Sequence, residues 1–295
     1  MRVLGDISLF AKDEGAESNP RAWFRAASRI VLFVHGYRVK PDDVHVSYQT
    51  FAEKLDSWPS GQWWGLGRVV WHGTAQTAIP LLDVFSYPFK PKEAVAAGKR
   101  LATLIERMRG AAGSRAEVCL VAHSLGCRVV FEALRLLPAP DDTDGPKLRL
   151  VAAMAAAVPT AELTPGGHLR PRSGLSRYLL VLYSPGDAVL RFAFPAGQTA
   201  ARAMGERRVY WRALGLYGEP QDLTHHRYRD FGNDGKPAGH GQYWTSTVAA
   251  EHVARYLGVP SAPRVATHAL DEHVLYPERG VAKHDLPVRR GLNAW

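Results

Sequence analysis

"CLVAHSLGCRVV", residues 119–130, joins two sequence patterns at one serine. The apolar residues before Ser124 are typical of a buried strand, and the residues after it have the spacing of a helix. A serine at such a junction has two common uses. It caps the helix, or it is a nucleophile that a tight turn exposes at the edge of a sheet. The rest of the chain must decide between the two.

Apolar strands alternate with amphipathic helices along most of the chain. This order predicts an α/β fold, with a mostly parallel central sheet and helices on both faces. Segment 148–158 fits a strand or a helix, and its place after a helix and a loop favours a strand. The predicted strands are 29–37, 68–73, 117–122, 148–158, 177–184 and 207–214, and the predicted helices are 45–57, 92–109, 125–137 and 243–257.

The chain of 295 residues is long enough for one large α/β domain. We expect that domain to cover residues 1–258. From Pro260 onward the sequence is rich in proline and charge and shows no clear period. Residues 259–295 are therefore predicted to form a C-terminal extension that wraps around the domain or is partly disordered.

Composition excludes several classes of protein. The net charge is +9, but the basic residues are scattered and do not alternate with aromatic residues, so nucleic-acid binding is not expected. Cys119 and Cys127 form no disulfide framework and no metal-ligand spacing, and we expect them to be small buried hydrophobic residues. No signal peptide and no apolar run of about 20 residues is evident. We therefore expect a soluble, cytoplasmic protein.

The residues around Ser124 meet the steric demands on a nucleophile between a strand and a helix. The turn is so tight that the residues two before and two after the serine must be small, and Ala122 and Gly126 stand there. A helix that begins at Leu125 directs its N-terminal amides toward the serine oxygen. These features favour a nucleophile, with the Leu125 N–H as one donor to an oxyanion.

A serine nucleophile needs a general base, and the base needs an orienting acid. In this architecture the expected chain order is serine, acid, histidine. Asp187, in "YSPGDAVL", follows the carboxyl end of the strand over 177–184, where α/β sheets gather their functional residues. The same aspartate could also cap a helix in a Pro-Gly turn. We predict Asp187 as the acid.

Several histidines compete for the role of base. His240, in "AGHGQYW", lies in a glycine-rich turn just before the last predicted helix, and this position favours it. His225 and His226 are adjacent in a polar loop, as solvated or structural histidines often are. His123 is next to the serine and is expected to point elsewhere.

The turn "FVHGY" follows the first predicted core strand, where the second oxyanion donor is expected. The backbone N–H of Tyr37 is the best candidate, and Gly36 would give the clearance. His35 could support this turn, or it could be a hydrogen-bonded histidine at a strand end. The second interpretation is favoured.

A metal site is the weaker alternative for the polar loop near the C-terminal helix. His225, His226, Asp230, Asp234 and His240 fall close together in the sequence. However, "DFGNDG" lacks the further oxygen ligands of a calcium loop, and the histidines lack the spacing of a helical zinc pair. No metal and no cofactor is predicted.

Taken in order, "FVHGY", "VAHSLGCRVV", "YSPGDAVL" and "GHGQYW" resemble the α/β-hydrolase superfamily, in particular its bacterial lipase- and esterase-like members. The resemblance covers roughly residues 29–258, and the chain has Ala-His-Ser-Leu-Gly where the usual pattern is Gly-x-Ser-x-Gly. By this resemblance the nucleophile, acid and base are Ser124, Asp187 and His240, and the oxyanion hole is formed by the backbone of Leu125 and Tyr37.

The resemblance implies a serine hydrolase that cleaves carboxylic esters or thioesters. Residues 57–67 and 78–89 are apolar and aromatic, so they could line a pocket for an apolar acyl group or simply add to the core. The expected partner is a small-molecule or lipid ester, and contact with a membrane or lipid surface is left open. The alternative is a binding or interaction module with the same fold but no catalysis.

Overall fold

The computed structural model describes residues 1–9, 22–23, 27–37, 41–57, 64–71, 90–111, 117–138, 147–172, 175–203, 210–218, 220, 222, 226–229 and 237–257. Within these residues, seven strands form one sheet in the order β1-β3-β2-β4-β5-β6-β7, and every neighbouring pair is parallel. The strands are β1 Arg2–Ser8, β2 Arg29–Val34, β3 Gly65–Val70, β4 Glu117–His123, β5 Lys147–Met154, β6 Ser176–Tyr183 and β7 His226–Arg229.

The central strands are apolar on both of their faces. In β2, every residue from Ile30 to Val34 is fully buried, and in β4 every residue from Val118 to Val121 is fully buried. Such continuous apolar runs are typical of parallel strands that helices cover on both sides. They also account for the strong strand prediction in these two segments.

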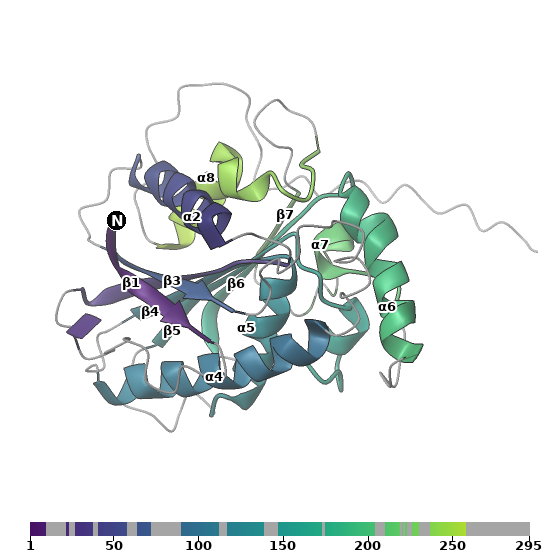
Figure 1. Ribbon diagram of the computed structural model, residues 1–295, viewed down its shortest axis with the longest axis horizontal. Helices are drawn as coiled ribbons and strands as arrows, with labels where there is room; N and C mark the ends of the chain where they lie inside the picture. The colour runs from purple at the N-terminus through teal and green to yellow at the C-terminus, as the bar shows by residue number, and fades with distance from the viewer. Residues whose placement is uncertain are drawn as a thin grey trace, which may run out of the picture. The chain divides into compact units, whose positions relative to one another are not determined.

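Helices cover both faces of the sheet, as Figure 1 shows. One layer contains α4 (Lys90–Ala111) and α5 (Leu125–Leu136), which contact each other. The opposite layer contains α2 (Pro41–Asp56) and α8 (Thr247–Leu257), also in contact. The predicted fold class is therefore confirmed.

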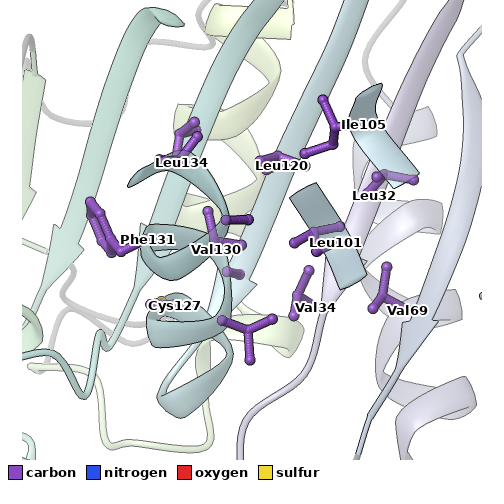
Figure 2. Packing of buried hydrophobic residues seen from close by; sticks show 14 of the residues in the cluster. Leu32, Val34, Val69, Leu101, Ile105, Leu120, Cys127, Val130, Phe131 and Leu134 are labelled. Carbon is purple, nitrogen blue, oxygen red and sulfur yellow. The ribbon is translucent and has the colours of Figure 1, made fainter. Parts of the chain in front are cut away.

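Alternate strand residues divide the core into two clusters. Leu32 and Val34 of β2 face α4 and α5, where Leu101 and Val130 pack against them (Figure 2). Phe33, between Leu32 and Val34 in the strand, belongs to the cluster on the other face. This alternation follows from the period of two in a strand, and it makes β2 part of both cores.

Short elements occupy the segments after β5 and β6 and before α8. They are the 3₁₀-helices η3 (Thr160–Leu163) and η5 (Tyr243–Thr245), the π-helix η4 (Val189–Ala193), and helices α6 (Phe194–Ala203) and α7 (Leu214–Tyr217). Within the described residues, no helix is long and apolar enough to cross a membrane.

The structure corrects one predicted strand and adds two. In the predicted strand over 207–214, the described part is not a strand: Ala213 forms an isolated antiparallel bridge with Pro159, and Leu214 begins α7. The strand beside β6 is instead β7, whose sequence "HRYR" carries no apolar pattern. Strand β1, at the opposite edge, was also not predicted.

Other predictions agree with the structure or fall outside it. The ambiguous segment 148–158 is a strand up to Met154. Cys119 and Cys127 are free and buried, and burial raises the pKa of both thiols. Residues 78–89, 259–295 and 58–63 lie outside the described residues. The predicted division at residue 258 and the roles of residues 78–89 and 259–295 therefore stay predictions. Of the segment 57–67, Trp64 and Leu66 are buried in the core at the amino end of β3, so this part adds to the core and does not line a pocket at the carboxyl edge of the sheet.

Candidate active site

Ser124 occupies the junction between β4 and α5 in a strained backbone conformation. Its φ is 53° and its ψ is −124°, a region that residues other than glycine rarely adopt. Three backbone hydrogen bonds hold it there. Its N–H donates to the Met154 carbonyl at 2.9 Å, and its own carbonyl accepts from Cys127 and Ala157, both at 3.1 Å. The side chain makes no capping hydrogen bond to α5, so the structure does not use Ser124 as a side-chain cap.

The small residues on either side of Ser124 are required by close packing, as the sequence predicted. Ala122 is buried between Val34 of β2 and Ala153 of β5. A Cβ atom added to Gly126 would lie 2.3 Å from the carbonyl oxygen of His35. The first turn of α5 therefore lies directly against the carboxyl end of β2.

The structure brings the predicted nucleophile, base and acid together in one hydrogen-bonded chain. The Nε2 atom of His240 is 2.8 Å from Ser124 Oγ, and its Nδ1 is 2.7 Å from Asp187 Oδ2. A carboxylate only accepts hydrogen bonds, so Nδ1 carries the proton of the neutral ring. Nε2 is then free to accept the proton of the Ser124 hydroxyl. Asp187 is fully buried, and the His240 side chain is partly buried.

Asp187 has the two uses that its sequence context suggested. Its Oδ1 accepts the backbone N–H of Leu190 at 2.9 Å, at the start of the helical segment that continues through η4 and α6. Its Oδ2 is left to contact His240. The turn before it is closed by the Asp187 N–H, which donates to the Ser184 carbonyl. One carboxylate thus orders its own loop and orients the imidazole.

His123 points elsewhere than to Ser124 Oγ, as expected, since the histidine on that oxygen is His240. Its Nε2 lies 2.7 Å from the backbone carbonyl oxygen of His240, a contact that the sequence did not indicate. Its ring is buried. The position of His123 at the end of an apolar strand could have predicted a buried histidine. Its partner, on a loop far away in the sequence, could not be predicted in this way.

His35 is the hydrogen-bonded histidine at a strand end that the sequence favoured. Its Nδ1–H donates to the Gly36 carbonyl at 2.7 Å, and its Nε2 accepts the Trp71 N–H at 3.3 Å. The two rings also stack, with their centroids 5.8 Å apart. Burial lowers the pKa of His35 to about 4, so the ring is neutral near neutral pH.

These contacts fix the turn in which the second oxyanion donor was predicted. The Gly36 carbonyl and the Tyr37 N–H belong to one planar peptide unit and point in opposite directions. Because His35 holds the carbonyl, it also fixes the direction of that N–H. A Cβ on Gly36 would lie 2.7 Å from Ser124 Cβ, so the turn passes directly beside Ser124. Leu125, the first residue of α5, has a backbone N–H without a partner inside the helix.

The loop that raised the metal alternative is described only in part. His225, Asp230 and Asp234 lie outside the described residues, as does the side chain of His226. Among the residues that the structure does describe, no three His, Cys, Asp or Glu side chains are grouped as a metal ion would need.

Comparison with known proteins gives a family. The family model described as "Alpha/beta hydrolase of unknown function (DUF900)" matches residues 16–203, which include Ser124 and Asp187. A comparison with curated proteins finds no significant match.

Two solved structures are similar to this chain at low identity. A protein of the alpha/beta superfamily from Xanthomonas campestris pv. campestris is 16% identical, with 78% of this chain and 98% of that one covered and a TM-score of 0.37. The apo form of Thermogutta terrifontis esterase 2 is 14% identical, with 81% and 86% covered and a TM-score of 0.33. At these TM-scores, the family assignment rests on the family model.

The close approach at Gly126 can be tested by one added methyl group. We expect Gly126→Ala to lower the free energy of unfolding by about 1–3 kcal/mol, because backbone atoms of β2 must move to admit the Cβ. Urea denaturation measures this change. Gly241→Ala is the matched control, because a Cβ there would meet no atom within 4 Å. Equal stability of the two variants would contradict the packing described here.

The buried histidines predict a loss of stability in mild acid. The folded-state pKa is lowered from 6.5 to about 4 for His35 and His252 and to about 3 for His123, in each case mainly by burial. Above pH 6.5 these rings are neutral in both states and contribute nothing to pH dependence. Below it the unfolded chain binds protons that the folded chain excludes, so stability falls as the pH drops toward 4.

Each histidine contributes a slope of about 1.4 kcal/mol per pH unit in that window. Urea denaturation at a series of pH values between 6.5 and 4 measures the total slope. We expect His35→Gln, which cannot titrate, to reduce the slope by about that amount. An unchanged slope in this variant would show that His35 is not buried as a neutral ring.

Proposed function

The chain belongs to the alpha/beta hydrolase family DUF900, and from this premise we propose that it is a serine hydrolase of carboxylic esters or thioesters. One observation carries the proposal. The His240 imidazole bridges Ser124 Oγ and the buried carboxylate of Asp187, at 2.8 and 2.7 Å. A nucleophile, a base and an orienting acid in hydrogen-bond contact are the parts that acyl transfer to a serine requires.

In the proposed first step, Ser124 attacks the carbonyl carbon of the substrate. His240 Nε2 takes the hydroxyl proton as the new C–O bond forms, and the carbonyl oxygen becomes an oxyanion. The buried Asp187 carboxylate stabilises the imidazolium that results. When the tetrahedral intermediate collapses, the bond to the leaving oxygen or sulfur breaks and His240 gives that atom its proton, so an alcohol or thiol leaves and an acyl-Ser124 ester remains.

In the second step, water replaces the leaving group. His240 takes a proton from the water as it attacks the acyl-Ser124 carbonyl, and a second oxyanion forms. Collapse of this intermediate breaks the bond to Ser124 Oγ, which takes the proton back from His240. The products are a carboxylic acid and the free serine, so the chemistry uses water alone and requires no metal or cofactor.

Backbone amides are the proposed stabilisers of both oxyanions. Leu125 offers its N–H from the N-terminus of α5, where the helix dipole is positive. Tyr37 offers the N–H of the peptide unit whose carbonyl His35 holds. Donors that are already oriented before the reaction stabilise the developing charge without reorganisation, which makes them effective in catalysis.

The proposed substrate is an ester or thioester with an apolar acyl group, either a small molecule or a lipid. The support comes from the sequence of residues 78–89, which is apolar and aromatic and follows the carboxyl end of β3 in the chain. A segment of this composition is suited to cover an acyl chain near the carboxyl edge of the sheet.

Removal of the proposed nucleophile is the direct test. We expect wild-type protein to gain one adduct from a fluorophosphonate probe and to hydrolyse p-nitrophenyl butyrate. Ser124→Ala should lose the adduct, and kcat/KM should fall by about 10⁴- to 10⁶-fold. Intact-mass spectrometry and steady-state kinetics measure the two effects.

Thr103→Ala is the control for this test, since the Thr103 hydroxyl is exposed on α4 and donates to the Lys99 carbonyl. It should keep both the adduct and the rate. An adduct on Ser124→Ala would remove this serine from the mechanism, and a folded wild-type protein that gains no adduct would favour the binding module.

Asp187→Asn separates the two uses of this side chain. An asparagine oxygen can still accept the Leu190 N–H, so the free energy of unfolding should change little. The amide no longer carries the charge that orients and stabilises the imidazole, so kcat should fall by about 10⁴-fold. Kinetics and urea denaturation together test this expectation. Asp222→Asn is the control, because Asp222 is exposed and pairs with Arg170. A variant with nearly full activity would exclude Asp187 as the acid.

A further inference from the structure

His240 lies in a short turn, between Gly239 and Gly241. Hydrogen bonds within the turn close it: the Gly239 carbonyl accepts the Gln242 N–H at 3.1 Å, and Gln242 Oε1 accepts the Gly239 N–H at 2.7 Å. Yet the imidazole must meet Ser124 on one side and Asp187 on the other, at hydrogen-bond distance from each. The turn's own hydrogen bonds join neighbouring residues only, so a contact between the turn and the strand that leads to Ser124 is needed to place the ring.

The His123 side chain makes that contact. Its Nε2 is 2.7 Å from the His240 carbonyl oxygen. A carbonyl oxygen only accepts, so Nε2 carries a proton. Burial, and after it the positive charge of a protonated His240 nearby, lower the pKa of His123 to about 3. His123 is therefore a neutral ring with its proton on Nε2, which is the tautomer that this hydrogen bond requires.

The His123 ring is itself held in place on several sides. Its centroid is 5.1 Å from that of His240 and 6.0 Å from those of Tyr243 and Trp244. A Cβ added to Gly36 would lie 3.2 Å from His123 Nδ1, so the ring also lies close to the turn of the predicted oxyanion hole. His123 thus contacts the base loop and lies beside that turn, and its own backbone leads directly into Ser124.

Trp244 anchors the other end of the same loop. Its ring packs against Phe33, Tyr48 and Phe51, with centroid distances of 5.5, 5.2 and 5.4 Å. These partners belong to β2 and α2, which are parts of the core. The loop is consequently fixed to the core through Trp244 and to the strand of the nucleophile through His123.

We infer that His123 is a positioning residue for His240: its Nε2–H holds the His240 carbonyl and so fixes where the imidazole meets Ser124. This inference rests on the proposed hydrolase function. A displacement of about 1 Å between reacting groups costs about 10²-fold in rate, so this hydrogen bond acts on the chemical step more than on substrate binding.

Two amide substitutions test the inference as a matched pair. In His123→Gln the amide nitrogen can reach roughly the place of the histidine Nε2 and donate to the His240 carbonyl. In His123→Asn the amide is too short and ends near the place of Nδ1. Both variants remove the ring and its aromatic contacts, so they share the loss of packing and differ mainly in the reach of the donor.

The hydrolysis of p-nitrophenyl butyrate compares the two variants. Each kcat is calculated per active site that the fluorophosphonate probe titrates, and we expect it to differ between them. His123→Asn should lose about 10- to 100-fold in kcat with little change in KM, and His123→Gln should stay within about threefold of wild type. A purely structural role would lower the unfolding temperature of both variants and leave kcat per titrated site unchanged. Equal kcat in the two variants, high or low, would overturn the inference.

A second measurement does not depend on catalysis. In protein with ¹⁵N-labelled histidine, NMR at neutral pH should show His123 as a neutral ring with its proton on Nε2. The ring signals of His240 should move in His123→Asn and stay near their wild-type positions in His123→Gln. A charged His123, or a proton on its Nδ1, would overturn the inference. A wild-type protein that shows these NMR signals but gains no probe adduct would instead contradict the proposed hydrolase function.

Discussion

The backbone of Ser124 is the constraint on which the rest of the site depends. A residue with φ near 53° costs about 1–3 kcal/mol unless its surroundings hold it there. The hydrogen bonds that do so come from both sides, since Cys127 in α5 and Ala157 beyond β5 donate to the same carbonyl. The Ala155 backbone is strained too, with φ of 45°, and its N–H donates to the Leu182 carbonyl in β6. The strain therefore lies where adjacent strands end and is stabilised by their mutual contacts.

A chain of backbone hydrogen bonds extends this support from Ser124 to Asp187. The Ala156 carbonyl accepts from Gly215, the Gly215 carbonyl accepts from Ser184, and the Ser184 carbonyl accepts from Asp187, at 2.9, 3.0 and 3.1 Å. Gly215 has no room for a Cβ, which would lie 2.1 Å from the Ala156 nitrogen. Helix α7, which contains Gly215, is thus joined to both loops. The relative position of Ser124 and Asp187 is set by main-chain geometry, and side-chain contacts are needed mainly for His240.

The parts of the site that could be predicted from sequence are those with local causes. The small residues Ser124 and Gly126 indicate a tight turn, and Asp187 follows a continuous apolar run that indicates a strand. The contact between His123 and His240 has no local cause, because the two residues are 117 positions apart and meet only when the chain folds. Strand β7 was missed for a related reason: its residues are polar, and its pairing with β6, rather than its own propensity, makes it a strand.

The same physical features bear on the choice between an enzyme and a binding module. Strain at Ser124 and the buried neutral rings of His35 and His123 all reduce stability, the histidines increasingly so as the pH falls below 6.5. A module that only binds a partner gains nothing from such features, and an apolar residue at position 35 or 123 would pack without the burial of an imidazole. For acyl transfer, each feature has a use: the backbone of Ser124 directs its hydroxyl toward His240, His35 orients the Tyr37 peptide, and His123 fixes the His240 loop. The pattern of these costs, concentrated around one hydroxyl group, supports catalysis over binding.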